Sequence, residues 1–129
     1  MPPDAPLPTD AELAILRTLW SDGPATVREV KGRLDTDQGY TTVLKHLQLM
    51  LEKGLVRRDE SGRAHVYATA IEEADTQRRL VRDLLDRAFG GSARQLVMRA
   101  LSTEDVSREE LDQIRTLLDQ IDDETDDDA

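Results

Sequence analysis

Residues 40–67, which read YTTVLKHLQLMLEKGLVRRDESGRAHVY, restrict the possible folds of this chain more than any other segment. The first half of the segment repeats apolar residues at helical spacing, and Gly54 follows as a residue that commonly ends a helix. The strand-forming pairs Leu55-Val56 and Val66-Tyr67 then flank a turn sequence at residues 59–62. The segment therefore predicts a helix that leads directly into a small β-hairpin.

Two further helices are predicted upstream, and each begins with a capping box. In this motif a threonine caps the helix and a glutamate three residues later bonds back to it, which matches Thr9 with Glu12 and Thr26 with Glu29. Gly23-Pro24 separates the two helices. Three helices followed by a hairpin are the element order of a winged helix-turn-helix, in which the hairpin forms the wing.

The second half of the chain predicts three more helices, the last of which carries a narrow apolar stripe. Gly90-Gly91 ends the first of them, and Ser107 with Glu110 forms a capping box ahead of the last. Because such stripes must be buried and three short helices make a poor core, we expect a second copy of the chain to cover them. Packing against the first half of the chain is the alternative. The expected dimerisation residues are Leu80, Leu84, Leu85, Leu111, Ile114, Leu117, Leu118 and Ile121.

The predicted fold class is mainly α with a small β wing: a winged helix-turn-helix followed by an α-helical dimerisation region. Residues 8–70 form the expected winged-helix DNA-binding domain, and residues 71–121 form the expected dimerisation region. Residues 1–7 are rich in proline and residues 122–129 are strongly acidic, so both ends are expected to be disordered.

The net charge of −10 argues against nucleic acid as a partner, but the distribution of that charge argues for it. Almost all of the excess negative charge lies in residues 69–129, whereas residues 40–67 carry more basic than acidic side chains. The chain has no cysteine, only two histidines and no recognisable catalytic set, so we expect neither an enzyme nor a metal or cofactor site. It has no apolar run long enough to span a membrane and no recognisable signal peptide, which favours the cytoplasm.

One side of the predicted third helix is apolar, and the other carries the small hydroxyls and the cation that suit the major groove of DNA. Simpler interpretations stay open: the two threonines only cap the helix, the lysine is solvated, and the two adjacent arginines are ordinary charged strand positions, of which only one side can face DNA. The leucine on the polar side contacts either a thymine methyl group or a neighbouring element. The candidate DNA-binding residues are Thr41, Thr42, Lys45, His46 and Leu49 in the helix, and Arg57, Arg58, Arg63 and His65 in the wing.

Four segments carry a family resemblance: LPTDAELAILRTLW, YTTVLKHLQLMLEKGLV, RAHVY and FGGSARQLV. In this order they resemble the penicillinase-repressor family of bacterial transcription regulators, the BlaI/MecI type, over roughly residues 7–120. The resemblance implies a homodimeric winged-helix repressor that binds an inverted-repeat DNA operator. At matching positions it places Thr41, Thr42 and Lys45 in the recognition helix. A winged-helix module that binds protein instead of DNA is the alternative function.

The chain departs from the family pattern at three points. The best-known members are cleaved at an Asn-Phe bond after the Gly-Gly pair, when a membrane-bound sensor protease responds. The matching bond here joins Arg99 to Ala100, so we expect release from DNA through a ligand, a partner or a different protease. Copper-responsive relatives carry a cysteine cluster that this chain lacks. Position 49, often basic in the family, is leucine, so the family's operator sequence is not transferred to this chain.

Overall fold

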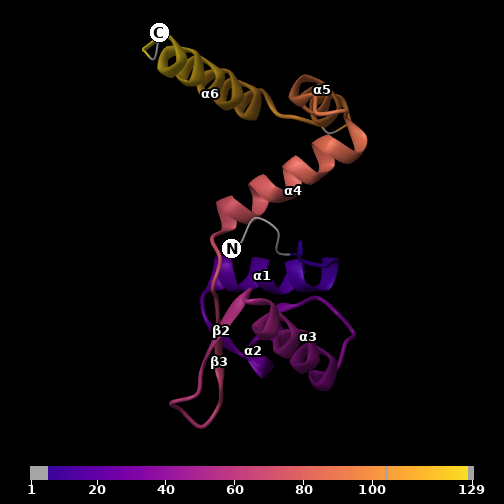
Figure 1. Cartoon of the computed structure of the whole chain (residues 1–129), viewed down its shortest axis with the longest axis vertical. Coiled ribbons are helices and arrows are strands. Elements are labelled where there is room, and N and C mark those ends of the chain that lie inside the picture. Colours follow the sequence, from indigo (N-terminus) through magenta and orange to yellow (C-terminus); the bar gives the residue numbers. More distant parts are fainter. Residues whose placement is uncertain (1–5, 104, 128–129) are drawn as a thin grey trace. The chain divides into compact units, whose positions relative to one another are not determined.

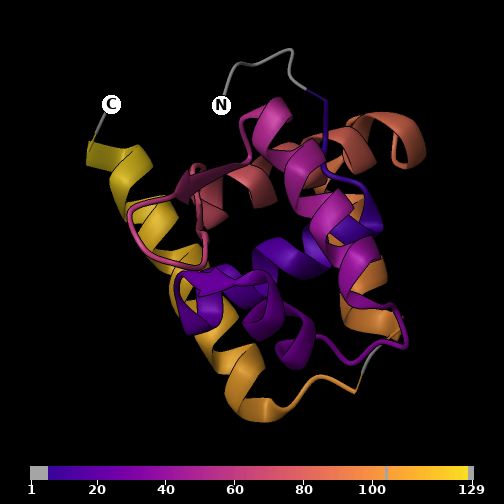
Figure 2. The same cartoon turned by 90° about the horizontal axis from the view of Figure 1, so that it is seen from below.

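A computed structural model describes residues 6–103 and 105–127 of the chain (Figures 1 and 2). Residues 1–5 of the predicted N-terminal segment and residues 128–129 of the predicted tail lie outside the described residues. Contacts divide the chain into two compact units, residues 1–83 and 84–129. In chain order, the elements are α1 (Asp10–Asp22), β1 (Ala25–Thr26), α2 (Val27–Arg33), α3 (Tyr40–Lys53), β2 (Val56–Asp59), β3 (Val66–Thr69), α4 (Glu73–Ala88), α5 (Ala93–Thr103) and α6 (Arg108–Asp127).

Both predicted capping boxes are present in the first unit. The Thr9 hydroxyl accepts a hydrogen bond from the Glu12 backbone N–H at 3.2 Å, and the Glu12 carboxylate accepts one from the Thr9 N–H at 2.9 Å. Thr26 and Glu29 repeat this arrangement at the start of α2. These reciprocal bonds satisfy backbone donors that would otherwise have no partner, which fixes where each helix begins.

The wing is part of a three-stranded antiparallel sheet, whereas the sequence predicted only a two-stranded hairpin. The strand order is β1-β3-β2, with Ala25 paired to Tyr67 and Arg58 paired to Tyr67 on the other side. The two-residue strand β1 has no pattern of its own, since alternation cannot be recognised over so short a segment. Pairing with β1 joins the base of the wing to the start of α2, while the loop between β2 and β3 projects away (Figure 1).

The core of the first unit is formed by α1, α2, α3 and the sheet. The apolar side of α3 is buried as predicted, with Val43, Leu47 and Met50 fully enclosed and Leu44 and Leu51 packed at the margin. The other core residues are Ile15, Leu16, Leu19, Ala25, Val27, Val30, Leu55, Val56, Tyr67 and Ile71. The core therefore holds α3 by one side only and leaves its opposite side to solvent.

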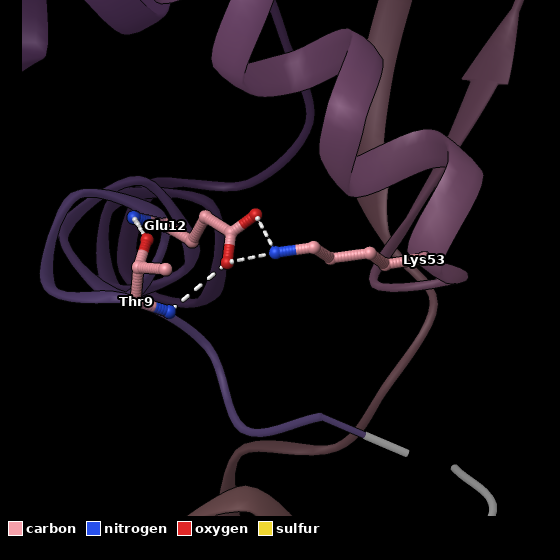
Figure 3. Close-up of polar contacts among 3 residues, drawn as sticks. All are labelled: Thr9, Glu12 and Lys53. Atoms are coloured by element: carbon pink, nitrogen blue, oxygen red, sulfur yellow. Dashed lines mark hydrogen bonds and ion pairs between the residues drawn. The ribbon is translucent and has the colours of Figure 1, made fainter.

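An ion pair between a buried carboxylate and a part-exposed lysine connects the first turn of α1 to the end of α3 (Figure 3). Lys53 Nζ donates to both carboxylate oxygens of Glu12, at 3.0 and 2.9 Å, and Glu12 is only 1% exposed. Burial raises the pKa of Glu12, but the hydrogen bond from the Thr9 backbone and the pairing with Lys53 outweigh it and hold this pKa below its ordinary value. The carboxylate is therefore charged at neutral pH and links two helices that lie far apart in sequence.

Replacing Glu12 by glutamine is expected to lower the free energy of unfolding at pH 7 by about 1–2 kcal/mol, since the charged pair with the part-exposed Lys53 is lost. Because the folded-state pKa of Glu12 is depressed, its stabilisation is present above the unfolded-state pKa and is lost as the pH falls. The difference between the two proteins should therefore shrink below about pH 4.3, the ordinary glutamate value. Urea unfolding at about pH 7 and about pH 3.5, one above and one below that value, measures this difference in stability. Glu29→Gln makes the same change in an exposed capping box without a lysine partner, and it should show a smaller effect that also fades at low pH, since the pKa of Glu29 is lowered as well. A pH-independent Glu12 effect would contradict the assignment.

The start of α4 is anchored to the first unit. Trp20 Nε1 on α1 donates to the Ile71 carbonyl oxygen at 3.1 Å, and the Ile71 side chain is buried. Thr76 is fully buried within the first turn of α4, where its hydroxyl donates to the Glu72 carbonyl. These contacts attach the start of α4 to the first unit, which extends to residue 83.

The second unit has no buried centre of its own. No side chain described between residues 84 and 125 is fully buried, and large apolar side chains on α5 and α6 are about half exposed. Helix α6 continues to Asp127 and not only to residue 121, where the sequence predicted its end. It therefore includes most of the expected acidic tail. Residues 122–127 contain no glycine or proline, and aspartate and glutamate on an exposed helix do not interrupt it.

Candidate nucleic-acid interface

Helix α3 presents its first turn to solvent without using the side chains there as caps. The N-cap residue is Gly39, which has no side chain to donate or accept, and Thr41 and Thr42 lie inside the helix and are exposed. The interpretation that the two threonines only cap the helix is therefore wrong. Both hydroxyls lie on the side of α3 that faces away from the core and are available to a ligand.

The remaining candidates on α3 differ in exposure. Lys45 is exposed one turn after Thr41, and Leu49 is 40% exposed one turn later, so these three side chains share one side of the helix. His46 is half-buried at the margin, and its Nδ1 atom is enclosed without a hydrogen-bond partner in the described structure. The exposed side of α3 thus combines hydroxyls, a cation and an apolar side chain, the groups that read base edges in the major groove.

The two adjacent wing arginines have different surroundings. Arg57 is exposed, whereas Arg58 is half-buried on the side of β2 that faces Tyr67 and forms an ion pair with Glu60. Hydrogen bonds to Tyr67 and to Glu60 raise the pKa of Arg58 above its ordinary value. Arg58 is therefore engaged within the wing, and Arg57 is the one of the pair that is open to a ligand.

A groove of about 440 Å³ lies between the wing, the start of α2 and the start of α3. The predicted residues Arg63 and His65 line it from the wing, and Tyr40 and Leu44 line it from α3. Arg28, near the start of α2, lines it as well. The sequence reasoning missed Arg28 and Tyr40, because nothing in the local pattern shows that α2 and the wing loop meet.

The predicted dimerisation residues lie on helices with open apolar surface. Leu84 is 40% exposed, and on α6 Leu117, Leu118 and Ile121 are 54%, 56% and 49% exposed. The others, Leu80, Leu85, Leu111 and Ile114, are half-buried. Val81, Val97 and Met98 are further exposed apolar side chains that the sequence reasoning did not include. Exposed apolar side chains that recur along one side of a helix, as on α6, favour a protein contact.

Other kinds of site are not found in the part of the chain that the structure describes. Among residues 6–103 and 105–127 no group of histidines and carboxylates could hold a metal ion. No helix within the same residues is both long and apolar enough to cross a membrane. The bond between Arg99 and Ala100 matches, by the family resemblance, the bond that is cleaved in the best-known relatives. In this chain the bond lies inside α5.

The first unit consists of three helices, the third of them exposed on one side, and a three-stranded sheet with a projecting hairpin. This arrangement defines a winged helix-turn-helix protein of the DNA-binding class. The family of the penicillinase repressor matches residues 8–120, so this chain belongs to the penicillinase-repressor family. It is accordingly a DNA-binding transcriptional repressor and not an enzyme.

Individual relatives agree with this assignment. The transcriptional regulator BlaI of Mycobacterium tuberculosis is 35% identical over 112 residues, which cover 84% of this chain and 80% of the relative. The penicillinase repressor of Bacillus licheniformis is 25% identical over 114 residues, covering 87% of this chain and 89% of the relative. The crystal structure of a transcriptional regulator from Thermotoga maritima aligns with 93% of this chain and with 78% of the Thermotoga chain. With 16% identity and a TM-score of 0.51, it is similar in fold.

Proposed function

We propose that the chain acts in the cytoplasm as a homodimeric repressor and binds an inverted-repeat operator through α3 and the wing. The observation that carries the DNA-binding part is the two-sided character of α3. Val43, Leu47 and Met50 hold one side rigidly in the core, while Thr41 and Lys45 project from the other. A helix held in this way can enter a major groove without any loss of packing.

The exposed apolar stripe of α6 supports the homodimer. Side chains such as Leu117 and Leu118 lie next to acidic residues on the rest of the helix, so the stripe is narrow and bounded. Contact of the stripe with its own copy keeps the acids at the rim and removes the apolar atoms from water. A two-fold contact of this kind uses the same surface on both subunits.

Two-fold symmetry determines the form of the operator. A dimer presents two copies of α3, so the DNA must offer two inverted half-sites whose centres are separated by about one or more helical turns. Helix α6 carries nine acidic residues and only two arginines, so it repels phosphates and favours DNA contact through the first unit. Selection of bound duplexes from random DNA is the direct test, and failure to bind any DNA would favour a winged-helix module for protein binding.

Replacing Lys45 by alanine is expected to weaken operator binding by about 1–3 kcal/mol and to relax the preference at one base pair, since the side chain reaches a base edge from the exposed side of α3. Binding to operator variants with single base changes measures both effects. Arg17→Ala, a change of an exposed cation on α1, is the matched control and should alter neither. Unchanged affinity and preference in Lys45→Ala would show that α3 is not the recognition helix.

A further inference from the structure

The groove between the wing, α2 and α3 has the chemical character of an anion site. Three of its lining side chains, Arg28, Arg63 and His65, are basic groups, and none of its described lining residues is acidic. Arg28 and Arg63 are exposed, and neither takes part in an ion pair found among the described residues. Two guanidinium groups around one groove repel each other until an anion lies between them.

The rest of the lining indicates which anion fits. Tyr40 contributes an aromatic ring that is 48% exposed, and Leu44 and Ala64 contribute apolar surface. A small inorganic ion would use only the cations, whereas a sugar–phosphate unit has an apolar sugar edge as well as a charged phosphate. The mixed lining therefore matches a sugar–phosphate better than a free ion.

The position of the groove identifies the source of that unit. Tyr40 directly precedes Thr41, so the groove adjoins the first turn of the helix that we propose enters the major groove. A phosphate held there would belong to the strand that flanks the base pairs read by α3. We infer that this groove binds one backbone sugar–phosphate of the operator, with Arg28 of α2 and Arg63 of the wing on the same phosphate. This inference rests on the proposed DNA-binding function and assigns Arg28 and Tyr40 to the interface.

A shared phosphate has a measurable consequence, because it links two elements that lie far apart in sequence. Arg28→Ala and Arg63→Ala should each weaken operator binding about tenfold, the loss of one charge-assisted contact. If the two side chains bind separate phosphates, the double variant should lose about the product of the two effects, roughly 100-fold. If they bind the same phosphate, the double variant should lose clearly less than that product.

The decisive experiment removes the charge from the DNA instead of the protein. A series of operator duplexes, each with a single neutral methylphosphonate linkage, is measured with the unmodified dimer and with Arg28→Ala. One linkage beside the half-site should weaken binding of the unmodified protein about as much as the double variant Arg28→Ala with Arg63→Ala does. In each single variant the same linkage should cost clearly less, because only one of the two contacts is left to lose, and in the double variant it should cost nothing.

Matched variants separate the site from general charge effects. Lys31→Ala changes an exposed cation of the same helix that does not line the groove, and it should remain sensitive to every linkage. Arg28→Lys keeps the charge and should recover part of the affinity. If the unmodified protein binds its operator and Arg28→Ala matches it at every linkage, the inference is wrong while the DNA-binding function stands. If the unmodified protein binds no DNA, the proposed function itself fails.

Discussion

Replacing both Leu111 and Leu118 by glutamate is expected to convert the dimer into a monomer at micromolar concentration. The two residues flank Ile114 on the apolar stripe of α6, and Leu118 is already 56% exposed in the single chain. The change at Leu118 therefore costs the isolated fold little, and Leu111, although half-buried, lies outside the core. In a two-fold contact both changes would bury like charges on both subunits. Loss of the dimer should weaken operator binding by roughly 10²–10⁴-fold, because the second half-site is no longer bound intramolecularly.

Light scattering for the mass of the particle and a binding titration on the operator measure these two effects. The control variant carries Thr116→Glu and Gln120→Glu, which add the same charge to the same helix away from the stripe. It should remain a dimer with unchanged affinity. A monomer for the unmodified protein, or a dimer for the Leu111 and Leu118 variant, would exclude α6 as the dimer contact.

Replacing one half of the selected operator by unrelated sequence of the same length should reduce affinity of the unmodified protein by about 100-fold or more. One recognition helix then lies on DNA that it does not recognise, and the gain from simultaneous binding is lost. On the intact operator, contact with about four phosphates per subunit gives a log–log salt slope of about −7. Titrations on both duplexes at several salt concentrations provide these values.

The monomeric variant supplies an internal control for the operator experiment. With glutamate at positions 111 and 118, intact and half operators should bind with nearly equal affinity, since one subunit occupies one half-site in either case. Equal binding of both duplexes by the unmodified protein would mean that it does not use an inverted repeat. A salt-independent affinity would mean that phosphates contribute little to the complex.

The helices of the first unit could be predicted from sequence because their signals are local. Thr9 with Glu12 and Thr26 with Glu29 form the expected capping boxes, and Gly54 ends α3 in the left-handed conformation with φ of 80°. The apolar side of α3 follows from spacing alone. All of these patterns depend on residues only a few positions apart, so no knowledge of the rest of the fold is required.

Features that depend on distant residues could not be predicted. The sequence shows neither the strand pairing of β1 with β3 nor the hydrogen bond that joins Trp20 to Ile71. Two adjacent arginines look equivalent in sequence, yet the alternation of β2 turns Arg58 toward Tyr67 and leaves Arg57 exposed. The sequence also left open that Thr41 and Thr42 cap α3, whereas in the structure Gly39 is the cap residue and the two threonines lie inside the helix.

By itself the sequence determined the order of the helices and the wing hairpin, the buried side of α3 and the family to which the chain belongs. The tertiary structure decided which charged groups meet: Glu12 with Lys53 between α1 and α3, and Arg28 with Arg63 and His65 around one groove. The physical reason is the range of the interactions. Helix caps and periodic apolar residues act over a turn or two, whereas an ion pair or a binding groove requires the packed core to bring remote segments together.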